Sequence, residues 1–211
     1  MPAPYQLAIF DFDGTLADSF AFFSEVYNTL AARHGFRHVD DAEARALRAL
    51  HARDIMRRVG MPAWKLPNVS AEFIGIMRKR RREIRPFAGA NGMLARLADG
   101  GVRLAIVSSN AEDNVREILG EGTATRIAHY ACGMSIFGKR AHLREVLREA
   151  GHAGGAAVYI GDQAADFDAA RAEHIAFGAV TWGYGEAGHL RALAPTHVFE
   201  RMEDITSTLL A

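Results

Sequence analysis

The chain has 211 residues, and its 25 basic and 25 acidic side chains give a formal net charge of zero. A protein that binds nucleic acid or a membrane surface through charge usually carries an excess of basic residues, so we expect neither partner. No apolar run has the length of a membrane-spanning helix, the first residues lack the pattern of a signal peptide, and the single cysteine cannot form an internal disulfide. We therefore predict a cytoplasmic protein with a sizeable core.

Short apolar runs, each followed by polar or acidic residues, recur along the chain. They predict strands at residues 7–10, 102–107, 156–160, 176–180 and 197–199. Apolar residues at helical spacing occupy the intervals between most of these runs. Strands that alternate with helices indicate an α/β fold with a doubly wound parallel sheet, in which ligands gather at the carboxyl ends of the strands.

The first predicted strand leads directly into Asp11 and Asp13. Both carboxylates can enter one crevice because the chain turns there, and Gly14 allows that turn to approach a ligand closely. A carboxylate beside a divalent cation can attack phosphorus, since the metal neutralises charge that would otherwise repel an anionic phosphoester. The second carboxylate can then protonate the leaving oxygen and later activate water.

Residues 19–85 contain no clear strand, and their apolar residues follow helical spacing. We predict that they form a helical cap domain, inserted into an α/β core domain that comprises residues 1–18 and 86–211. An insert that leaves the sheet beside Asp11 and Asp13 would lie over them as a lid. The basic run at residues 78–82 resembles a nucleic-acid patch, but a solvated helix face is the preferred interpretation because the rest of the chain compensates its charge.

Ser108, Ser109 and Asn110 follow the strand predicted at residues 102–107 and precede a helix. Asn110 can be an ordinary helix N-cap, with Asp113 at the third helical position. A hydroxyl and free backbone N–H groups at a helix start can also bind phosphate, and the two roles are compatible. Ser108 is the better placed of the two hydroxyls.

Lys139 stands at the start of another predicted helix, where a lysine is commonly a solvated surface residue. The chain returns to the sheet immediately afterwards, so Lys139 could instead neutralise a phosphate and the nucleophilic carboxylate together.

Asp162 and Asp166 follow the strand predicted at residues 156–160. Either could simply cap a helix after a tight turn. An aspartate at this strand end, beside Asp11, would also supply the hard oxygen ligand that Mg²⁺ prefers. Asp166, one helical turn further on, would bind the metal directly or orient its ligands.

Residues 183–188 read G-Y-G-E-A-G and fit the dinucleotide fingerprint G-x-G-x-x-G. Few residues follow this stretch, and no other part of the sequence is organised around it. We therefore predict a flexible loop at the rim of the site rather than a nucleotide site.

Four segments together resemble, in order, the motifs of the haloacid dehalogenase superfamily. They are DFDGTLADS at residues 11–19, VSSN at 107–110, FGK at 137–139 and GDQAAD at 161–166. The helical insert resembles the C1-type cap of that superfamily, and the chain is most similar to the phosphoglycolate phosphatase-like branch. Gln163 and Ala165 depart from the usual last motif, which leaves the finer subfamily open.

The resemblance implies a catalytic site and a metal site. Asp11 would be the nucleophile that becomes an aspartyl-phosphate, and Asp13 the general acid and base. The phosphate of the substrate would be bound by Ser108, Ser109, Asn110 and Lys139. Mg²⁺ would be held by Asp11, the backbone carbonyl of Asp13 and Asp162, with support from Asp166.

We accordingly predict a Mg²⁺-dependent phosphatase that acts on a small phosphorylated metabolite. A phosphomutase with the same aspartate pair remains an alternative, as does a non-catalytic protein that uses a phosphoaspartate as a signal. In a C1-type cap, the turn between the early helices would face the nucleophile. Arg48 and His51 are therefore candidates for substrate recognition, although both can also be ordinary surface residues of an arginine-rich helix.

Overall fold

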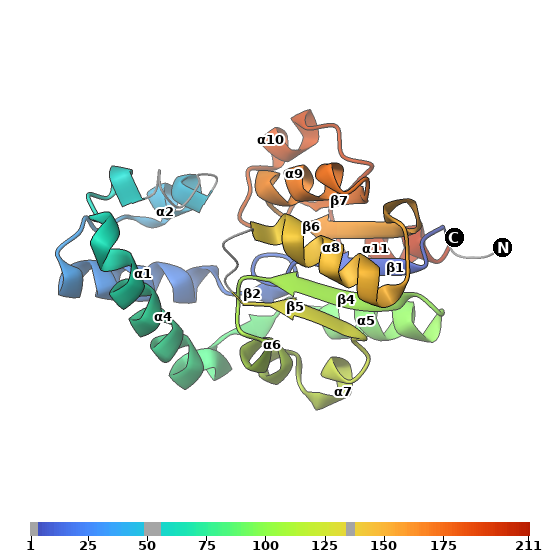
Figure 1. Cartoon of the computed structure of the whole chain (residues 1–211), viewed down its shortest axis with the longest axis horizontal. Coiled ribbons are helices and arrows are strands. Elements are labelled where there is room, and N and C mark those ends of the chain that lie inside the picture. The colour runs from blue at the N-terminus through green and yellow to red at the C-terminus, as the bar shows by residue number, and fades with distance from the viewer. Residues whose placement is uncertain (1–3, 49–55, 134–137) are drawn as a thin grey trace.

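The computed structural model describes residues 4–48, 56–133 and 138–211, and for Arg48 it describes the backbone alone. Within these residues, six parallel strands form the central sheet in the order β5-β4-β1-β6-β7-β8 (Figure 1). Their bounds are β1 Leu7–Phe10, β4 Arg103–Ser108, β5 His129–Cys132, β6 Ala157–Gly161, β7 Ala176–Val180 and β8 His197–Phe199. The predicted doubly wound parallel sheet is confirmed.

Strand β1 lies in the middle of the sheet and is buried on both faces. It pairs with β4 on one side and with β6 on the other, so that Ile9 lies opposite Ala105 and Tyr159. Ala8 and Phe10 belong to one apolar cluster, whereas Leu7 and Ile9 belong to the other. A strand that is covered on both faces is apolar along its whole length, which is why β1 is evident in the sequence.

Strand β5 is an element that the sequence analysis did not predict. Among the described residues it lies at the edge of the sheet and pairs with β4 alone, with Ala105 opposite His129. His129 and Tyr130 are half-buried, so the strand lacks the apolar run of the central strands.

Helices cover both faces of the sheet. The helices against one face are α5 Ala90–Asp99, α6 Glu112–Leu119 and α11 Met202–Leu209, and those against the other are α8 Gly138–Ala150, α9 Ala164–Ala172 and α10 Ala187–Ala192. The buried apolar residues of each group belong to a separate cluster. The short elements α7 Glu121–Ala124 and η3 Gly154–Ala156 complete the core.

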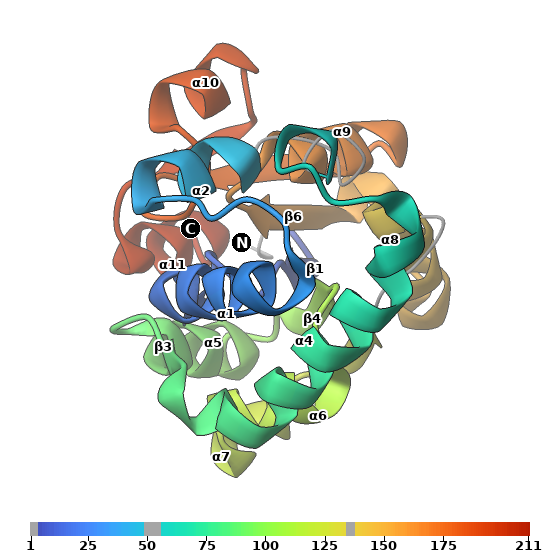
Figure 2. The ribbon, with the colours of Figure 1, turned by 90° about the vertical axis from the view of Figure 1, so that its left-hand side faces the viewer.

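The remaining helices lie beyond the carboxyl ends of the strands, toward which the strand arrows point (Figure 1). They are α1 Phe20–His34, α2 Asp41–Arg48, η1 Ala63–Lys65, α4 Leu66–Arg80 and η2 Arg81–Glu83. Figure 2 looks onto α1, α2 and α4 from this side. The chain leaves and re-enters the core through β2 Ala17–Asp18 and β3 Arg85–Pro86, which pair antiparallel. The exact division into core and cap domains stays a prediction.

The basic run at residues 78–82 connects the base of α4 to the core. Arg81 and Arg82 both form ion pairs with Glu117 of α6, and Arg80 pairs with Glu25 and Glu83. The predicted solvated helix face is therefore correct for Arg78 and Lys79, which are exposed. It is not correct for Arg81, whose side chain is only 24% exposed. None of the described helices is long and apolar enough to cross a membrane.

Candidate active site

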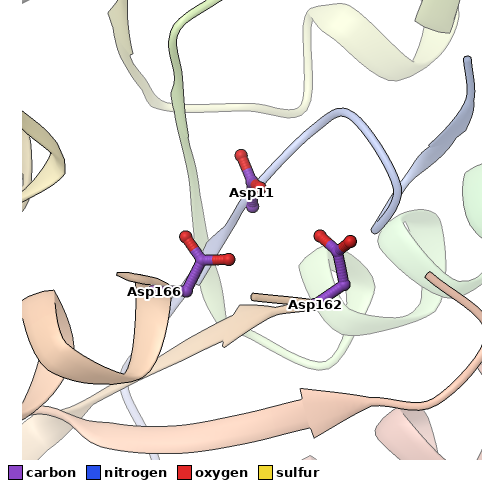
Figure 3. A group of neighbouring side chains, drawn as sticks. All are labelled: Asp11, Asp162 and Asp166. Atoms are coloured by element: carbon purple, nitrogen blue, oxygen red, sulfur yellow. The ribbon is translucent and has the colours of Figure 1, made fainter. Parts of the chain in front are cut away.

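Three neighbouring strands bring the predicted site residues to one edge of the sheet. Asp11 follows β1, Ser108 ends β4 and Asp162 follows β6. Asp166 lies in the first turn of α9, beside the end of β6 (Figure 3). Asp11, Asp162 and Asp166 are buried, and each offers a carboxylate oxygen within 4.8 Å of the others. The fold thus assembles residues that lie far apart in the sequence.

Lys139 of α8 reaches this cluster. Its Nζ lies 2.7 Å from Asp11 Oδ2 and 2.5 Å from Asp166 Oδ1. Burial alone would lower the pKa of Lys139, but the negative charges of Asp11 and Asp166 raise it above its usual value. The side chain, which is 22% exposed, is therefore an ammonium ion held between two carboxylates and not a solvated surface lysine.

The cluster contains more negative than positive charge. Burial raises the pKa of Asp11 well above its usual range, with a smaller opposing effect from Lys139. Burial and the neighbouring Asp166 raise the pKa of Asp162 to about 6. One ammonium against three carboxylates leaves a deficit of positive charge in a site of low dielectric constant. A hard divalent cation with oxygen ligands fits this donor set.

Hydrogen-bond donors orient the two carboxylates that follow β6. Asp162 accepts from Thr15 Oγ1 at 3.0 Å and from the backbone N–H of Tyr184 at 2.8 Å. Asp166 accepts from the Tyr159 hydroxyl at 2.9 Å and from the backbone N–H of Gln163 at 3.0 Å. These bonds hold the carboxylate oxygens near one another despite their repulsion.

Gly14 is required by the close approach of the first loop to Asp162. Its φ is 86°, and a Cβ at this position would lie 2.5 Å from Asp162 Oδ2. Both the backbone conformation and the space therefore exclude a side chain, as the sequence analysis expected of this turn.

Asp13 is held from two directions. Ser19 Oγ donates to its Oδ1 at 2.7 Å, and Asn110 Nδ2 donates to its Oδ2 at 3.3 Å. The Oδ1 of Asn110 accepts from the backbone N–H of Ala111 at 2.9 Å and from Asn114 Nδ2 at 3.0 Å. Because two donors face this oxygen, the amide nitrogen of Asn110 is turned toward Asp13.

The N-cap interpretation of Asn110 is wrong. Helix α6 begins at Glu112, its N-cap is Ala111, and no side chain caps it. The Asn110 amide instead donates to Asp13 and accepts from Asn114 and from the backbone N–H of Ala111. Ser108 is buried, and its Oγ accepts from the backbone N–H of Asn110 at 3.1 Å, whereas Ser109 is exposed.

Residues 183–185 form a loop, as predicted, but this loop packs directly on Asp162 and does not lie at the rim of the site. A Cβ at Gly183 would lie 2.2 Å from Asp162 Cβ, and one at Gly185 would lie 2.0 Å from the Asp162 carbonyl oxygen. Tyr184 is buried between them, and its hydroxyl is hydrogen-bonded to Ser19. The two glycines therefore serve close backbone packing around Asp162.

The comparisons with known proteins agree with this geometry. Residues 8–180 match the model of the haloacid dehalogenase-like hydrolase family. This chain belongs to that family and is a hydrolase. A phosphoglycolate phosphatase from Synechococcus elongatus is 30% identical over 205 residues, which cover 95% of each protein.

Two further similarities extend over most of the chain. The tyrosine-protein kinase PtkA from Mycobacterium tuberculosis is 29% identical over 208 residues, which cover 92% of this chain and 68% of that protein. A haloacid dehalogenase-like family hydrolase from Streptococcus pneumoniae superposes with a TM-score of 0.85 at 18% identity, and covers 97% of this chain and 98% of its own. At that identity the structural similarity shows the fold alone.

The two cap residues predicted to recognise substrate are not placed in the site. Arg48 is the last residue of α2, and its side chain is outside the described part of the structure; His51 lies outside the described residues altogether. Their role stays a prediction.

Five residues at this hydrolase site were not singled out from the sequence. Thr15 and Ser19 lie within the segment that carries Asp11, and Tyr184 stands between two glycines. Tyr159 carries a detectable signal, because it is polar among the buried apolar residues of β6, whereas Asn114 stands between Asp113 and Val115 in α6 and carries none. A buried polar side chain needs a partner, and here the partners are Asp166 and Asn110.

We expect Gly185→Ala to lower the free energy of unfolding by about 1–3 kcal/mol, because the added Cβ would overlap the backbone of Asp162. Gly188→Ala is the matched control in the same stretch, since its Cβ would meet only the end of the Glu186 side chain. That control should lose at most about 1 kcal/mol, the typical value for a weakened helix cap. Urea denaturation measures both, and equal losses would contradict the packing described for Gly185.

Proposed function

We propose that this hydrolase is a phosphatase that cleaves small phosphomonoesters, with Asp11 as nucleophile and Mg²⁺ as cofactor. The observation that carries the proposal is the position of Lys139, whose ammonium contacts both Asp11 and Asp166 inside a cluster of three buried carboxylates. This arrangement of Lys139 and the three carboxylates suits the binding of a phosphate group together with a divalent cation. Family membership and the similarity to a phosphoglycolate phosphatase support the same conclusion.

The two aspartates of the first loop divide the chemistry between them. A carboxylate oxygen of Asp11 attacks phosphorus, an Asp11–phosphorus bond forms, and the ester P–O bond breaks. Asp13 gives its proton to the departing alkoxide. Asp13 then takes a proton from water, and the water oxygen attacks phosphorus to release phosphate and regenerate Asp11.

Charged and polar groups around Asp11 stabilise the transferring phosphoryl group. Lys139 neutralises part of its charge, and Ser108, Ser109 and Asn110 provide hydrogen-bond donors at the end of β4. Mg²⁺ bound by Asp11, Asp162 and the backbone carbonyl of Asp13, with Asp166 in support, would supply the remaining positive charge.

We expect Asp11→Asn to reduce hydrolysis of p-nitrophenyl phosphate by on the order of 10³-fold or more, because an amide is a far poorer nucleophile than a carboxylate. Asp168→Asn changes an exposed carboxylate on α9 and should retain activity. Retention of a tenth of the wild-type activity in Asp11→Asn would exclude Asp11 as the nucleophile.

Assays of the purified wild-type protein distinguish a phosphatase from the two alternative functions. Accumulation of one phosphoryl group per chain without turnover would indicate a phosphoaspartate signalling protein. Isomerisation of a sugar phosphate in place of phosphate release would indicate a phosphomutase.

The metal and protons should compete for the carboxylate cluster. In the metal-free protein the pKa of Asp162 is raised from 3.8 to about 6, so the folded state binds the proton of this carboxyl group more tightly than the unfolded state does. The contribution of this group to stability is therefore greatest below its unfolded pKa and is lost as the pH rises through its folded pKa. A Mg²⁺ ion held by the deprotonated Asp162 would offset this loss.

We accordingly expect Mg²⁺ to raise the melting temperature more at about pH 7.5 than at about pH 5. Differential scanning fluorimetry in chelator and in excess Mg²⁺ measures the shift at each pH. Asp162→Asn should abolish most of the shift, because it removes a charged ligand. An equal shift at both pH values would contradict metal binding by this cluster.

The hydrogen bonds to Asn110 predict that Asn114 positions the general acid. Asn114→Leu removes one of the two donors that fix the Asn110 amide, so Asp13 should be held less well. We expect kcat/KM for alkyl phosphates to fall about tenfold further than that for p-nitrophenyl phosphate, whose leaving group needs little protonation. A loss shared equally by both substrates would indicate general damage to the fold.

A further inference from the structure

Tyr159 is a polar side chain in the buried middle of β6. It is fully buried, and its ring packs against that of Phe177, with the two centroids 6.2 Å apart. Leu7 and Ile9 of β1 belong to the same apolar cluster. A phenylalanine would fill this space equally well, so packing does not explain the hydroxyl group. The hydroxyl donates to Asp166 Oδ1 at 2.9 Å, and this bond accounts for a tyrosine at this position.

Both carboxylate oxygens of Asp166 accept hydrogen bonds, and they serve different parts of the structure. Oδ2 accepts from the backbone N–H of Gln163 at 3.0 Å, within the capping box at the start of α9. Oδ1 accepts from Tyr159 and lies 2.5 Å from Lys139 Nζ. The side chain also lies against Gly161, where a Cβ would be 2.7 Å from Asp166 Oδ2. The Tyr159 hydroxyl therefore fixes Asp166 Oδ1 at the point where this oxygen meets the ammonium group.

The position of the Lys139 ammonium group depends on the oxygens around it. A lysine side chain has a flexible four-carbon stem, so the groups that its end binds determine where that end lies. Lys139 Nζ lies 2.7 Å from Asp11 Oδ2 and 2.5 Å from Asp166 Oδ1. It thus bridges the proposed nucleophile and the carboxylate that Tyr159 orients. A shift of Asp166 Oδ1 would move the ammonium group relative to a phosphoryl group on Asp11.

The Tyr159 hydroxyl also affects the balance between the two carboxylates that share this ammonium group. A hydrogen-bond donor offsets part of the negative charge of the oxygen that it contacts. It therefore weakens the attraction between Asp166 Oδ1 and Lys139 Nζ. Without the hydroxyl, Lys139 would be drawn toward Asp166 and away from Asp11. The phosphoryl group would then lose part of its charge neutralisation during transfer.

We propose that Tyr159 is a positioning residue for phosphoryl transfer, whose hydroxyl fixes Asp166 Oδ1 and thereby holds the Lys139 ammonium group beside Asp11. This inference rests on the proposed phosphatase activity and adds to it a residue that acts through two others. Lys139 would act on the phosphoryl group, which all substrates share. Loss of the hydroxyl should therefore affect all esters alike, in contrast to a change at Asn114, whose effect depends on the leaving group.

Tyr159→Phe tests the inference in the full chain with Mg²⁺. We expect kcat/KM to fall about tenfold for both p-nitrophenyl phosphate and isobutyl phosphate. Tyr130→Phe is the matched control, because it removes the hydroxyl of a half-buried tyrosine in β5 that donates to the Ala124 carbonyl at 2.8 Å. This control should stay within about twofold of the wild type, since its hydrogen bond lies outside the carboxylate cluster.

Three results of this comparison would contradict the inference. Unchanged kcat/KM in Tyr159→Phe, or an equal fall in both variants, would overturn it and leave the phosphatase activity established. A fall confined to isobutyl phosphate would overturn it as well, because the hydroxyl would then act on the leaving group. Failure of the wild type to hydrolyse either ester would overturn the proposed function, and the inference with it.

A double-mutant cycle shows whether the hydroxyl acts through Lys139. In a Lys139→Met background, Tyr159→Phe should lower kcat/KM for p-nitrophenyl phosphate by less than about twofold further, because the group that it positions is already absent. A further tenfold fall would show that the hydroxyl acts by another route, and would overturn the inference.

Binding measurements separate this role from a role in metal binding. The hydrogen bonds that Asp162 accepts from Thr15 and from the Tyr184 backbone are unchanged in Tyr159→Phe, so Mg²⁺ should still raise the melting temperature. Calorimetry with inorganic phosphate in excess Mg²⁺ should show affinity about fivefold weaker than in the wild type. Loss of the Mg²⁺-dependent shift, or unchanged phosphate affinity, would overturn the inference.

Discussion

The arrangement of the site follows from the burial of three carboxylates around a single ammonium ion. Lys139 contacts Asp11 and Asp166 directly, but it cannot compensate all the negative charge at this edge of the sheet. Asp162 and Asp166 also accept hydrogen bonds from Thr15, from Tyr159 and from backbone N–H groups. Such a site is costly when empty of cations and favourable when a divalent cation is bound, which links ligand binding to stability.

The position of β1 in the sheet makes this cluster possible. Because β4 and β6 flank β1, the residues that follow all three strands emerge side by side at the carboxyl edge. The loop at residues 183–185 closes over Asp162 from β7, the next strand along. Close packing there requires glycine on both sides of Tyr184, so the end of the sheet and Asp162 form one compact unit.

Asp13 connects this unit to the helices beyond the sheet. Ser19 lies where the chain leaves the core, and it bonds both Asp13 and the Tyr184 hydroxyl. On the other side, Asn110 links Asp13 to Asn114, whose Oδ1 lies 3.5 Å from Arg81 Nη1 at the point where the chain returns. Hydrogen bonds from Ser19 and Asn110 therefore hold Asp13 from two sides.

The sequence by itself determined the parallel α/β core, the helical insert and the candidate residues, because buried strands are continuously apolar and each ends in polar residues. It could not determine which half-buried edge segment pairs with β4, since β5 carries no comparable apolar run. It also did not show that Asn110 donates to Asp13, or that Gly183 and Gly185 pack on Asp162. Hydrogen bonds and close contacts between residues distant in the chain depend on how the elements pack, so only the tertiary structure decided them.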